Sequence, residues 1–282
     1  SVDSMQIYRG MTIGTAAPTA EEMEGIPHHM VAVADPADSW SVARFTAAAD
    51  GCIQDILRRG KRPVLVGGTG LYLDALVRGT DFAAGSHGGA IRQQLQQRME
   101  RQGAAALLAE LQTIDPAAAA RLHLRDEKRI VRALEVYYET GETITEHDRR
   151  SRETPPRYRA LRIGLAFRDR ADMWARIDRR VDDMVAQGLL QEVETLLQSG
   201  LPRDATALQA IGYKQFLAVA EGRATVDEAI AEVKLRSRQY AKRQLTWLRR
   251  DEDIHWILWE KTPDFPAGLQ NATEFLLSAG VC

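Results

Sequence analysis

The sequence contains little cysteine and no long apolar segment. Its two cysteines among 282 residues, Cys52 and Cys282, cannot form a disulfide framework and are typical of a reducing compartment. No run of about 18 apolar residues occurs, which excludes a membrane-spanning helix, and no charged-then-apolar signal peptide is present. No Cys-x-x-Cys zinc spacing occurs, and the adjacent His28 and His29 have no further ligand at suitable spacing. We therefore expect a cytoplasmic globular protein, and a monomer because no apolar surface stripe remains unassigned.

The net charge of −2 combines two regions of opposite sign. Residues 1–60 contain eight acidic and four basic side chains, whereas Lys234 to Arg250 contains seven basic side chains and no acidic one. Such asymmetry indicates a polyanionic partner, and the alternative is an ordinary solvated helix face. A solvated face normally includes acids, so a nucleic acid is the favoured interpretation.

Apolar segments and helix-forming segments alternate along most of the chain. Strands are predicted at 62–66, 161–167 and 255–258, with helices at 42–59, 71–78 and 170–187. This order predicts an α/β fold with a parallel sheet flanked by helices. Residues 90–140 are instead rich in helix formers and follow a glycine-rich hinge at 85–89. We therefore predict three segments: core residues 1–84, a helical insertion at 85–156, and core residues 157–282 with a long basic helix.

Two predicted strands end beside polar or glycine-rich residues. Asp3 follows a short apolar start, and Gly67-Gly68-Thr69-Gly70 links the strand at 62–66 to a helix. Ligands bind at the carboxyl ends of parallel strands, and free amides at a helix start suit anions. On position alone, a loop or helix-capping role for Asp3 is equally well supported.

Two groups of basic residues could contact phosphates or bases. Arg176 and Arg180 share one helix face and suit a diphosphate, although salt bridges to nearby aspartates are the favoured alternative. In the basic helix, polar and aromatic side chains interleave with the cations, a pattern that reads splayed RNA bases; these are Gln244, Thr246 and Trp247. A second basic cluster lies in the insertion, at Lys128, Arg129 and Arg132.

Taken together, these segments resemble the bacterial tRNA dimethylallyltransferases, also called tRNA isopentenyltransferases. The matching motifs occur in family order over nearly the whole chain: 1–8, 10–11, 13–16, 27–29, 35–36, 66–72, 129–130, 132–136, 211–215 and 242–249. The resemblance implies a P-loop NTPase-like sheet with a helical insertion. It implies transfer of a dimethylallyl group from dimethylallyl diphosphate to N6 of adenine 37, next to the tRNA anticodon, with release of diphosphate.

The resemblance also implies roles for individual residues. Asp3 matches the general base, Thr69 a threonine near the reacting centre, and Arg176 and Arg180 the diphosphate-binding arginines. Residues in the tRNA-contacting stretches are Asp3, Ser4, Met5, Gln6, Thr69, Arg92, Lys128, Arg129, Ile130, Val131, Arg132, Gln209, Gly212, Tyr213, Lys214, Lys242, Arg243, Gln244, Thr246, Trp247 and Arg249.

The sequence departs from the family pattern at its start. The family has a glycine-rich phosphate loop of the GxxxxGK[ST] type upstream of the residues matching Ser1, and no such motif occurs here. That loop would hold the diphosphate and supply ligands to Mg²⁺, so we expect feeble or no activity from these 282 residues alone. The linker at 82–89 and Gln209 also differ from the family pattern. Two other functions stay open: a fragment of a P-loop small-molecule kinase, and an inactive tRNA-binding fragment.

Overall fold

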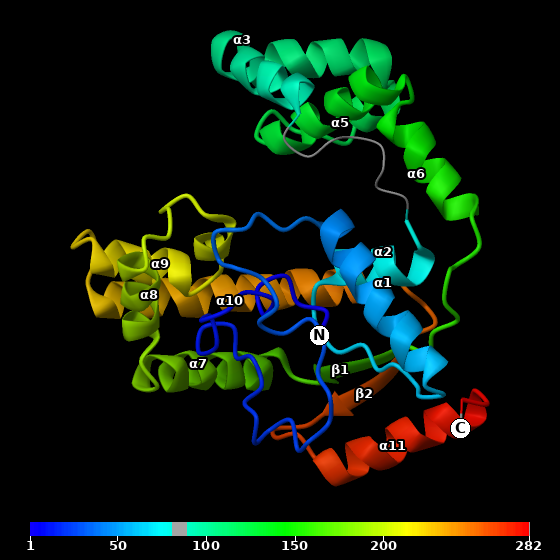
Figure 1. Cartoon of the computed structure of the whole chain (residues 1–282), viewed down its shortest axis with the longest axis vertical. Helices are drawn as coiled ribbons and strands as arrows, with labels where there is room; N and C mark the ends of the chain where they lie inside the picture. Colours follow the sequence, from blue (N-terminus) through cyan, green and yellow to red (C-terminus); the bar gives the residue numbers. More distant parts are fainter. Residues whose placement is uncertain (81–88, 282) are drawn as a thin grey trace. The chain divides into compact units, whose positions relative to one another are not determined.

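A computed structural model describes residues 1–80 and 89–281, except for the side chain of Arg152 (Figure 1). The chain forms two compact units. Unit 1 comprises Ser1–Trp40, Ala47–Leu73 and Arg159–Cys282, and unit 2 comprises Ser41–Thr46 and Asp74–Tyr158. The predicted insertion at 85–156 falls within unit 2, which begins earlier in the chain. Most of the predicted glycine hinge, and the predicted boundary at residue 84, lie outside the described residues.

Unit 1 combines a small parallel sheet with helices that pack around it. Strands β1 (Ile163–Phe167) and β2 (His255–Trp259) pair in parallel, with Ile163 opposite His255 and Phe167 opposite Trp259. A parallel bridge joins Tyr8 to Ala34. The predicted strands at 161–167 and 255–258 and their parallel arrangement are therefore confirmed.

The helices of unit 1 follow the predicted positions closely. Two of these helices are shared between the units: unit 1 contains the C-terminal part of α1, from Ala47 onward, and the N-terminal part of α2, up to Leu73. The elements are α1 (Val42–Arg58), α2 (Gly70–Arg78), α7 (Arg170–Ala186), α8 (Leu189–Gln198), the 3-10 helix η1 (Thr206–Gln209), α9 (Tyr213–Ala220), α10 (Val226–Leu248) and α11 (Phe265–Ser278). Helix α10 packs against α7 and α9, and α11 packs along β2 (Figure 1). No helix in the described ranges is both long and apolar enough to cross a membrane.

The predicted strand at 62–66 is wrong as a buried sheet strand. The segment is not assigned to any strand, and within the described residues its one backbone hydrogen bond to another segment is that of the Val66 carbonyl, which accepts from the N–H of Val2 at 2.7 Å. Val64 is 80% exposed and Val66 is 68% exposed. An apolar, β-branched segment becomes a strand only where another backbone pairs with it, and the described residues supply no such partner along its length.

A carboxylate on α8 holds the loop that follows the first residues. Glu192 accepts hydrogen bonds from the backbone N–H groups of Thr12 at 2.8 Å, Ile13 at 2.9 Å and Gly14 at 3.1 Å, and from the Thr12 hydroxyl at 2.9 Å. The hydroxyl of Tyr213 on α9 also donates to Glu192. Three consecutive amides aimed at one carboxylate form an anion-binding nest, here filled by the protein itself.

The packing around Glu192 leaves no room for a side chain at residue 14. A Cβ added to Gly14 would lie 2.5 Å from the ring of Tyr213, which is fully buried. Burial, together with the negative charge of Glu192, raises the pKa of Tyr213, so the phenol stays a hydrogen-bond donor. The glycine, the tyrosine and the carboxylate therefore act as one unit that attaches the loop to α8 and α9.

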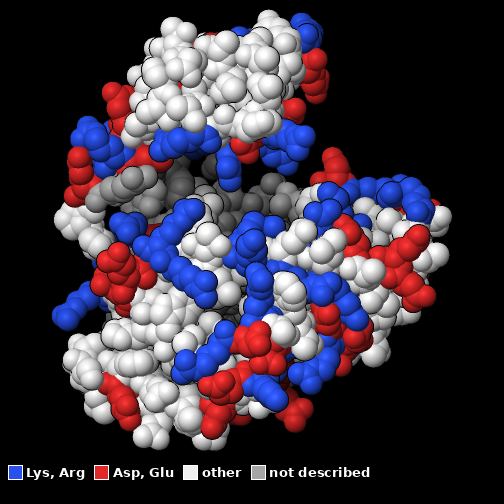
Figure 2. All heavy atoms as spheres, turned by 180° about the vertical axis from the view of Figure 1, so that it is seen from behind, with Lys and Arg blue, Asp and Glu red and all other residues white. Residues whose placement is uncertain are grey.

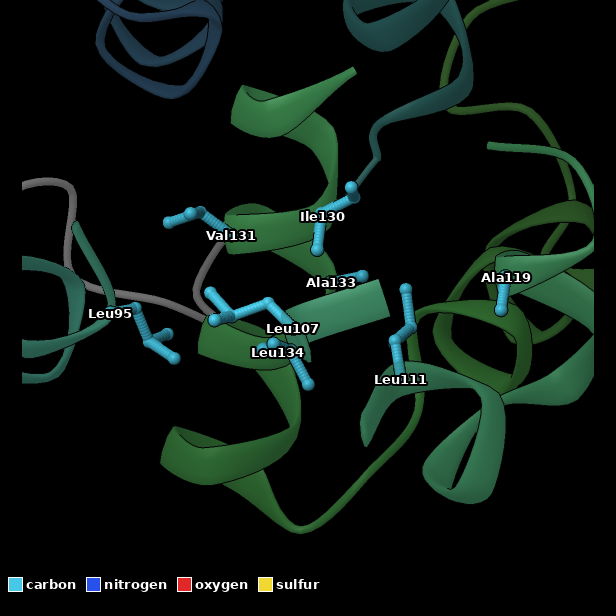
Figure 3. Packing of buried hydrophobic residues seen from close by; sticks show 8 residues of the cluster. All are labelled: Leu95, Leu107, Leu111, Ala119, Ile130, Val131, Ala133 and Leu134. Atoms are coloured by element: carbon cyan, nitrogen blue, oxygen red, sulfur yellow. The ribbon is translucent and has the colours of Figure 1, made fainter. Parts of the chain in front are cut away.

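Unit 2 is helical and has its own apolar core. Its helices are α3 (Ala90–Ile114), α4 (Pro116–Ala119), α5 (Glu127–Thr140) and α6 (Ile144–Glu153). The core joins α3, α4 and α5, and consists of Leu95, Leu107, Leu111, Ala119, Ile130, Val131, Ala133 and Leu134 (Figure 3). Asp115 caps α4 by accepting from the Ala118 N–H at 2.9 Å, and binds the N–H and hydroxyl of Thr145 at the start of α6. The predicted helical character of 90–140 is thus confirmed.

Truncation of Leu134 tests the core of unit 2. Leu134 is fully buried between α3 and α5, so Leu134→Ala removes apolar contacts and leaves a cavity. We expect the free energy of unfolding to fall by about 2–5 kcal/mol, measured by denaturant titration of helical circular dichroism. Leu124→Ala is the control because Leu124 is 46% exposed, and it should change stability by less than about 1 kcal/mol. Equal effects of the two variants would contradict this core.

Removal of the Glu192 carboxylate tests its role as the anchor of the loop. Glu192→Ala leaves three amides and the Tyr213 hydroxyl without their acceptor, so we expect unfolding free energy to fall by about 2–4 kcal/mol. Glu194→Ala, on the same helix, is the matched control, since Glu194 has no hydrogen bond or ion pair in the described part of the chain. Tyr213→Phe should add little to Glu192→Ala, because both changes break the same hydrogen bond. Full additivity would show that the two groups act separately.

Candidate functional site

The backbone brings Asp3 and the glycine turn at 67–70 together in unit 1. The N–H of Val2 donates to the carbonyl of Val66 at 2.7 Å, and the N–H of Thr69 donates to the carbonyl of Val2 at 3.3 Å. The N–H of Ser4 then donates to the Thr69 hydroxyl oxygen at 3.3 Å. A Cβ on Gly67 would lie 2.2 Å from the Val2 carbonyl oxygen, so only glycine permits this approach. The two segments predicted to end side by side therefore do so.

Asp3 combines the two roles that its position allows. Its Oδ1 accepts from the N–H groups of Met5 at 2.8 Å and Gln6 at 3.2 Å, which is a turn-capping arrangement. Its Oδ2 accepts no hydrogen bond from the described residues. One oxygen thus fixes the carboxylate in place, and the other is left for a ligand. The negative charge of Asp3 also contributes, after burial and Tyr8, to raising the pKa of Tyr72 to about 12.

Helix α10 packs directly on the glycine turn. The side-chain NH₂ of Gln244 donates to the Gly68 carbonyl at 2.8 Å. A Cβ on Gly68 would lie 1.9 Å from Gln244 Nε2, and one on Gly70 would lie 2.4 Å from the indole of Trp247. Gln244 and Trp247 are therefore next to Thr69, as a site that stacks and hydrogen-bonds a base requires.

Tyr240 is a site residue that the sequence analysis missed. It is one helical turn before Gln244 on α10, and Thr69 and Gln244 both lie close enough to its phenol to lower the pKa of that group. Burial raises the pKa of Tyr240, and the charge of Asp3 acts in the same direction. In sequence, Tyr240 continues the apolar stripe of the helix, and only its spacing of four from Gln244 marks it as part of the site.

Arg180 on α7 interacts electrostatically with Asp3 and with Arg176, which lies one helical turn before it. Neither guanidinium forms an ion pair with the described residues, and Asp178, a predicted alternative partner, pairs instead with Arg238 at 3.4 Å. Arg180 keeps exposed surface, but partial desolvation lowers the pKa of its guanidinium. The negative charge of Asp3 opposes this shift, and the positive charge of Arg176 lowers the pKa further. Two unneutralised guanidiniums beside a carboxylate form a suitable place for an anion.

The basic stretch on α10 divides into a paired half and an unpaired half. Lys234 pairs with Asp182 at 2.6 Å, Arg236 with Glu232 at 2.6 Å, and Arg238 with Asp178 at 3.4 Å. The remaining cations form no ion pair with the described residues; these are Lys242, Arg243, Arg249 and Arg250. The acids that neutralise the first half come mainly from α7, so the charge available to a polyanion is concentrated near the glycine turn.

Basic side chains are prominent on the surface, and two of those on α10 lie beside aromatic rings. Figure 2 shows Lys and Arg side chains gathered in patches on one face, with Asp and Glu interspersed between them. In α10, the guanidinium of Arg243 lies 5.6 Å from the ring centre of Tyr240, and that of Arg250 lies 5.4 Å from the ring centre of Trp247. Cations above exposed or half-exposed rings are arranged as in surfaces that bind single-stranded RNA.

In unit 2, a buried glutamate holds two of the predicted tRNA-contacting arginines. Glu135 is fully buried and accepts from Arg132 at 2.9 Å and from Arg92 at 3.2 Å. Lys128 and Arg129 on the same helix are exposed. The structure thus brings these four cations onto α5 and the start of α3, and the sequence analysis missed the glutamate that positions two of them.

Burial corrects several of the predicted tRNA contacts. Ile130 and Val131 belong to the core of unit 2, and Tyr213 at the first position of α9 and Gly212 directly before it are buried, so these side chains support the fold instead of contacting a ligand. The Gln6 amide donates to the carbonyls of Thr15 and Ala16 and accepts from the Ser1 hydroxyl. The other predicted contacts keep accessible surface: Ser4, Met5, Gln209, Lys214, Lys242, Arg243, Thr246 and Arg249.

The described residues do not form a metal site on their own. No group of three or more His, Cys, Asp or Glu side chains lies within metal-binding range in that part of the chain. Near the site, the described residues offer Mg²⁺ one carboxylate, that of Asp3, and one hydroxyl, that of Thr69. Mg²⁺ binds more ligands than these two, even when it takes some of them from a diphosphate.

The chain is similar over almost its full length to tRNA-modifying enzymes. It is 45% identical over 257 residues to the tRNA dimethylallyltransferase of Carboxydothermus hydrogenoformans, covering 91% of this chain and 82% of the relative. It is 39% identical over 281 residues to that of Acetivibrio thermocellus, covering 100% of this chain and 90% of the relative. These relatives do not support the kinase alternative.

Two solved structures share the fold. The full-length tRNA isopentenylpyrophosphate transferase from Bacillus halodurans matches with a TM-score of 0.69 at 39% identity, covering 99% of this chain and 86% of that one. A eukaryotic dimethylallyltransferase, studied acting on tRNA, matches with a TM-score of 0.76 at 30% identity, covering 96% and 69%. The predicted P-loop-like α/β fold with helical insertion is the fold of these structures. The model of the family described as IPP transferase matches residues 6–251. The chain therefore belongs to the IPP transferase family.

Proposed function

We propose that this protein transfers a dimethylallyl group from dimethylallyl diphosphate to N6 of an adenine next to the tRNA anticodon. The observation that carries the proposal is the convergence of Asp3, Thr69, Arg180 and Gln244 at one place in unit 1. A carboxylate, a hydroxyl, a guanidinium pair and an amide are the groups that an amine nucleophile, a diphosphate and a base edge require. The relatives named above carry this activity in their names.

In the proposed reaction, the adenine amine attacks C1 of the allyl group. The C1–O bond to diphosphate breaks, a C–N bond forms, and the amine loses one proton. Asp3 takes that proton on Oδ2, the oxygen that no described residue occupies, while the Met5 and Gln6 N–H groups hold Oδ1. Because an exocyclic adenine amine is a weak nucleophile, a fixed carboxylate that orients and deprotonates it lowers the barrier.

The leaving diphosphate gathers negative charge as the C1–O bond breaks. Arg180, which interacts with Asp3, and Arg176 one turn before it offer two guanidiniums without an ion-pair partner among the described residues, and they stabilise that charge without first having to break an internal ion pair. The adenine has to leave its base stack to reach Asp3, which costs on the order of a few kcal/mol. Trp247, 37% exposed beside the glycine turn, offers a stacking surface that offsets part of that cost.

Three finer points belong to the same proposal. Mg²⁺ accompanies the diphosphate, because a free diphosphate carries more charge than two guanidiniums neutralise. The enzyme works in the cytoplasm, where its tRNA is found. It works as a monomer, although the exposed Phe265, Leu269 and Leu277 on α11 leave an apolar face that the sequence analysis did not anticipate.

Asp3→Asn, in the full protein that the gene encodes, tests the general base. The amide oxygen keeps the two turn hydrogen bonds of Oδ1, whereas the variant cannot accept the proton. We expect turnover to fall by at least about 10²-fold, measured with labelled dimethylallyl diphosphate and an anticodon stem-loop. The affinity for the stem-loop should change less than about threefold. An equal fall in turnover and affinity would show that Asp3 binds tRNA and does not act as the base.

Lys242 and Lys234 form a matched pair for testing the tRNA surface. Both are on α10, but Lys242 has no ion-pair partner among the described residues and Lys234 is paired with Asp182. Lys242→Gln should weaken stem-loop binding and reduce the slope of log K against log salt by about one, because one phosphate contact is lost. Lys234→Gln makes the same change in net charge and should leave the slope unchanged. The same slope change in both variants would contradict the division of the basic stretch.

A further inference from the structure

We propose that Glu135 is a positioning residue for tRNA binding, which holds Arg92 and Arg132 together so that both guanidiniums contact the phosphate backbone of the tRNA. The inference rests on the proposed function, because it concerns how that tRNA is bound. It concerns a different place from the candidate site, since all three residues belong to unit 2. In this proposal, an acidic side chain strengthens the binding of a polyanion.

The carboxylate of Glu135 is shared between arginines of two helices. Its Oε2 accepts from Nη1 of Arg132 on α5 at 2.9 Å and from Nη1 of Arg92, near the start of α3, at 3.2 Å. Because both hydrogen bonds meet at one oxygen, the two Nη1 atoms lie within about 6 Å of each other, a distance at which like charges repel. The carboxylate offsets this repulsion and keeps the two cations side by side.

Glu135 is hidden from solvent, whereas both arginines reach the surface. The side chain of Glu135 is 0% exposed, and those of Arg92 and Arg132 are each 25% exposed. The glutamate therefore cannot contact a ligand itself, and it acts on one only through the guanidiniums. Arg92 donates one of its five N–H groups to Glu135, and the other four have no acceptor among the described residues.

The arrangement is less favourable for stability than the same three side chains allow. A guanidinium binds a carboxylate most strongly through both oxygens, but here both arginines bind Oε2, and the buried Oε1 of Glu135 has no hydrogen-bond partner in the described part of the chain. An unsatisfied buried oxygen costs free energy, and a buried ion cluster is often less stable than apolar side chains of similar volume. What the arrangement provides is a pair of restrained cations with an excess of positive charge.

A further cation extends this surface along α5. Lys128 is four residues before Arg132, so the two share one helix face, and Lys128 is exposed without an ion pair in the described ranges. A guanidinium binds phosphate through paired N–H donors, and one that is already held in place loses less conformational entropy on binding. The restrained arginine pair beside Lys128 therefore suits the phosphate backbone of an RNA strand.

Glu135→Gln, in the full protein that the gene encodes, distinguishes positioning from charge. The amide has the size of the carboxylate but not the charge that holds two guanidiniums together. Removal of a negative charge by itself tightens RNA binding, whereas loss of positioning weakens it, so the two effects have opposite signs. We expect the Kd for a tRNA anticodon stem-loop to rise about five- to tenfold, and the slope of log K against log salt to fall by about one, because one phosphate contact is lost.

Glu100→Gln is the matched control, because Glu100 is exposed on α3 in the same unit and the variant makes the same change in net charge. Its Kd should stay the same or fall slightly. Glu135→Met, whose apolar side chain suits the buried position, is a second variant with the same expectation as Glu135→Gln. Kd is compared well below the unfolding temperature of each variant, and circular dichroism verifies that it is helical. An unchanged or lower Kd in the folded Glu135 variants would overturn the proposal.

A double-mutant cycle with Arg92→Gln tests whether Glu135 acts through the arginine. Arg92→Gln alone should raise the Kd, and Glu135→Gln should then raise it further by less than it does in the wild-type background. Fully additive effects would also overturn the positioning role. A wild-type protein that transferred no dimethylallyl group would contradict only the proposed function, because the cycle measures binding.

Discussion

Two missing side chains determine how the candidate site is built. Gly68 and Gly70 leave space that Gln244 and Trp247 of α10 occupy, and any Cβ there would overlap with them. Because the helix lies against the turn, Gln244 can bind the Gly68 carbonyl. Glycine is required here for close approach between two elements that are 176 residues apart in the sequence. The geometry of the site therefore depends on the packing of α10 against the glycine turn as well as on its polar groups.

Two carboxylates hold neighbouring groups in place by accepting several hydrogen bonds, without being part of the candidate site. Glu192 gathers three amides, a threonine hydroxyl and a phenol, and so fixes the loop that the Gln6 side chain contacts. In unit 2, buried Glu135 holds Arg92 and Arg132 in fixed positions. A buried carboxylate is stable only when such donors surround it, and the same donors then lose their freedom to move.

The cations of α10 show how neighbours decide the role of a residue. Lys234 and Lys242 are the same residue type on the same helix, yet Asp182 on α7 neutralises the first and no described residue pairs with the second. The acids that divide the basic stretch are up to 60 residues away in sequence, as in the pair of Arg238 with Asp178. A count of charges along the helix therefore overstates the surface available to a polyanion.

The sequence by itself determined the element types, the parallel arrangement of β1 and β2, the helical unit, and the pairing of Asp3 with the glycine turn. The spacing of apolar residues and the positions of the glycines encode these features within short segments of the chain. Only the tertiary structure decided that 62–66 has no ladder of its own and that Tyr213, Ile130 and Val131 are buried. It also decided that Tyr240 belongs to the site. Each of these outcomes depends on which distant backbone or side chain fills the adjacent space, and that information is not present in any single segment of the chain.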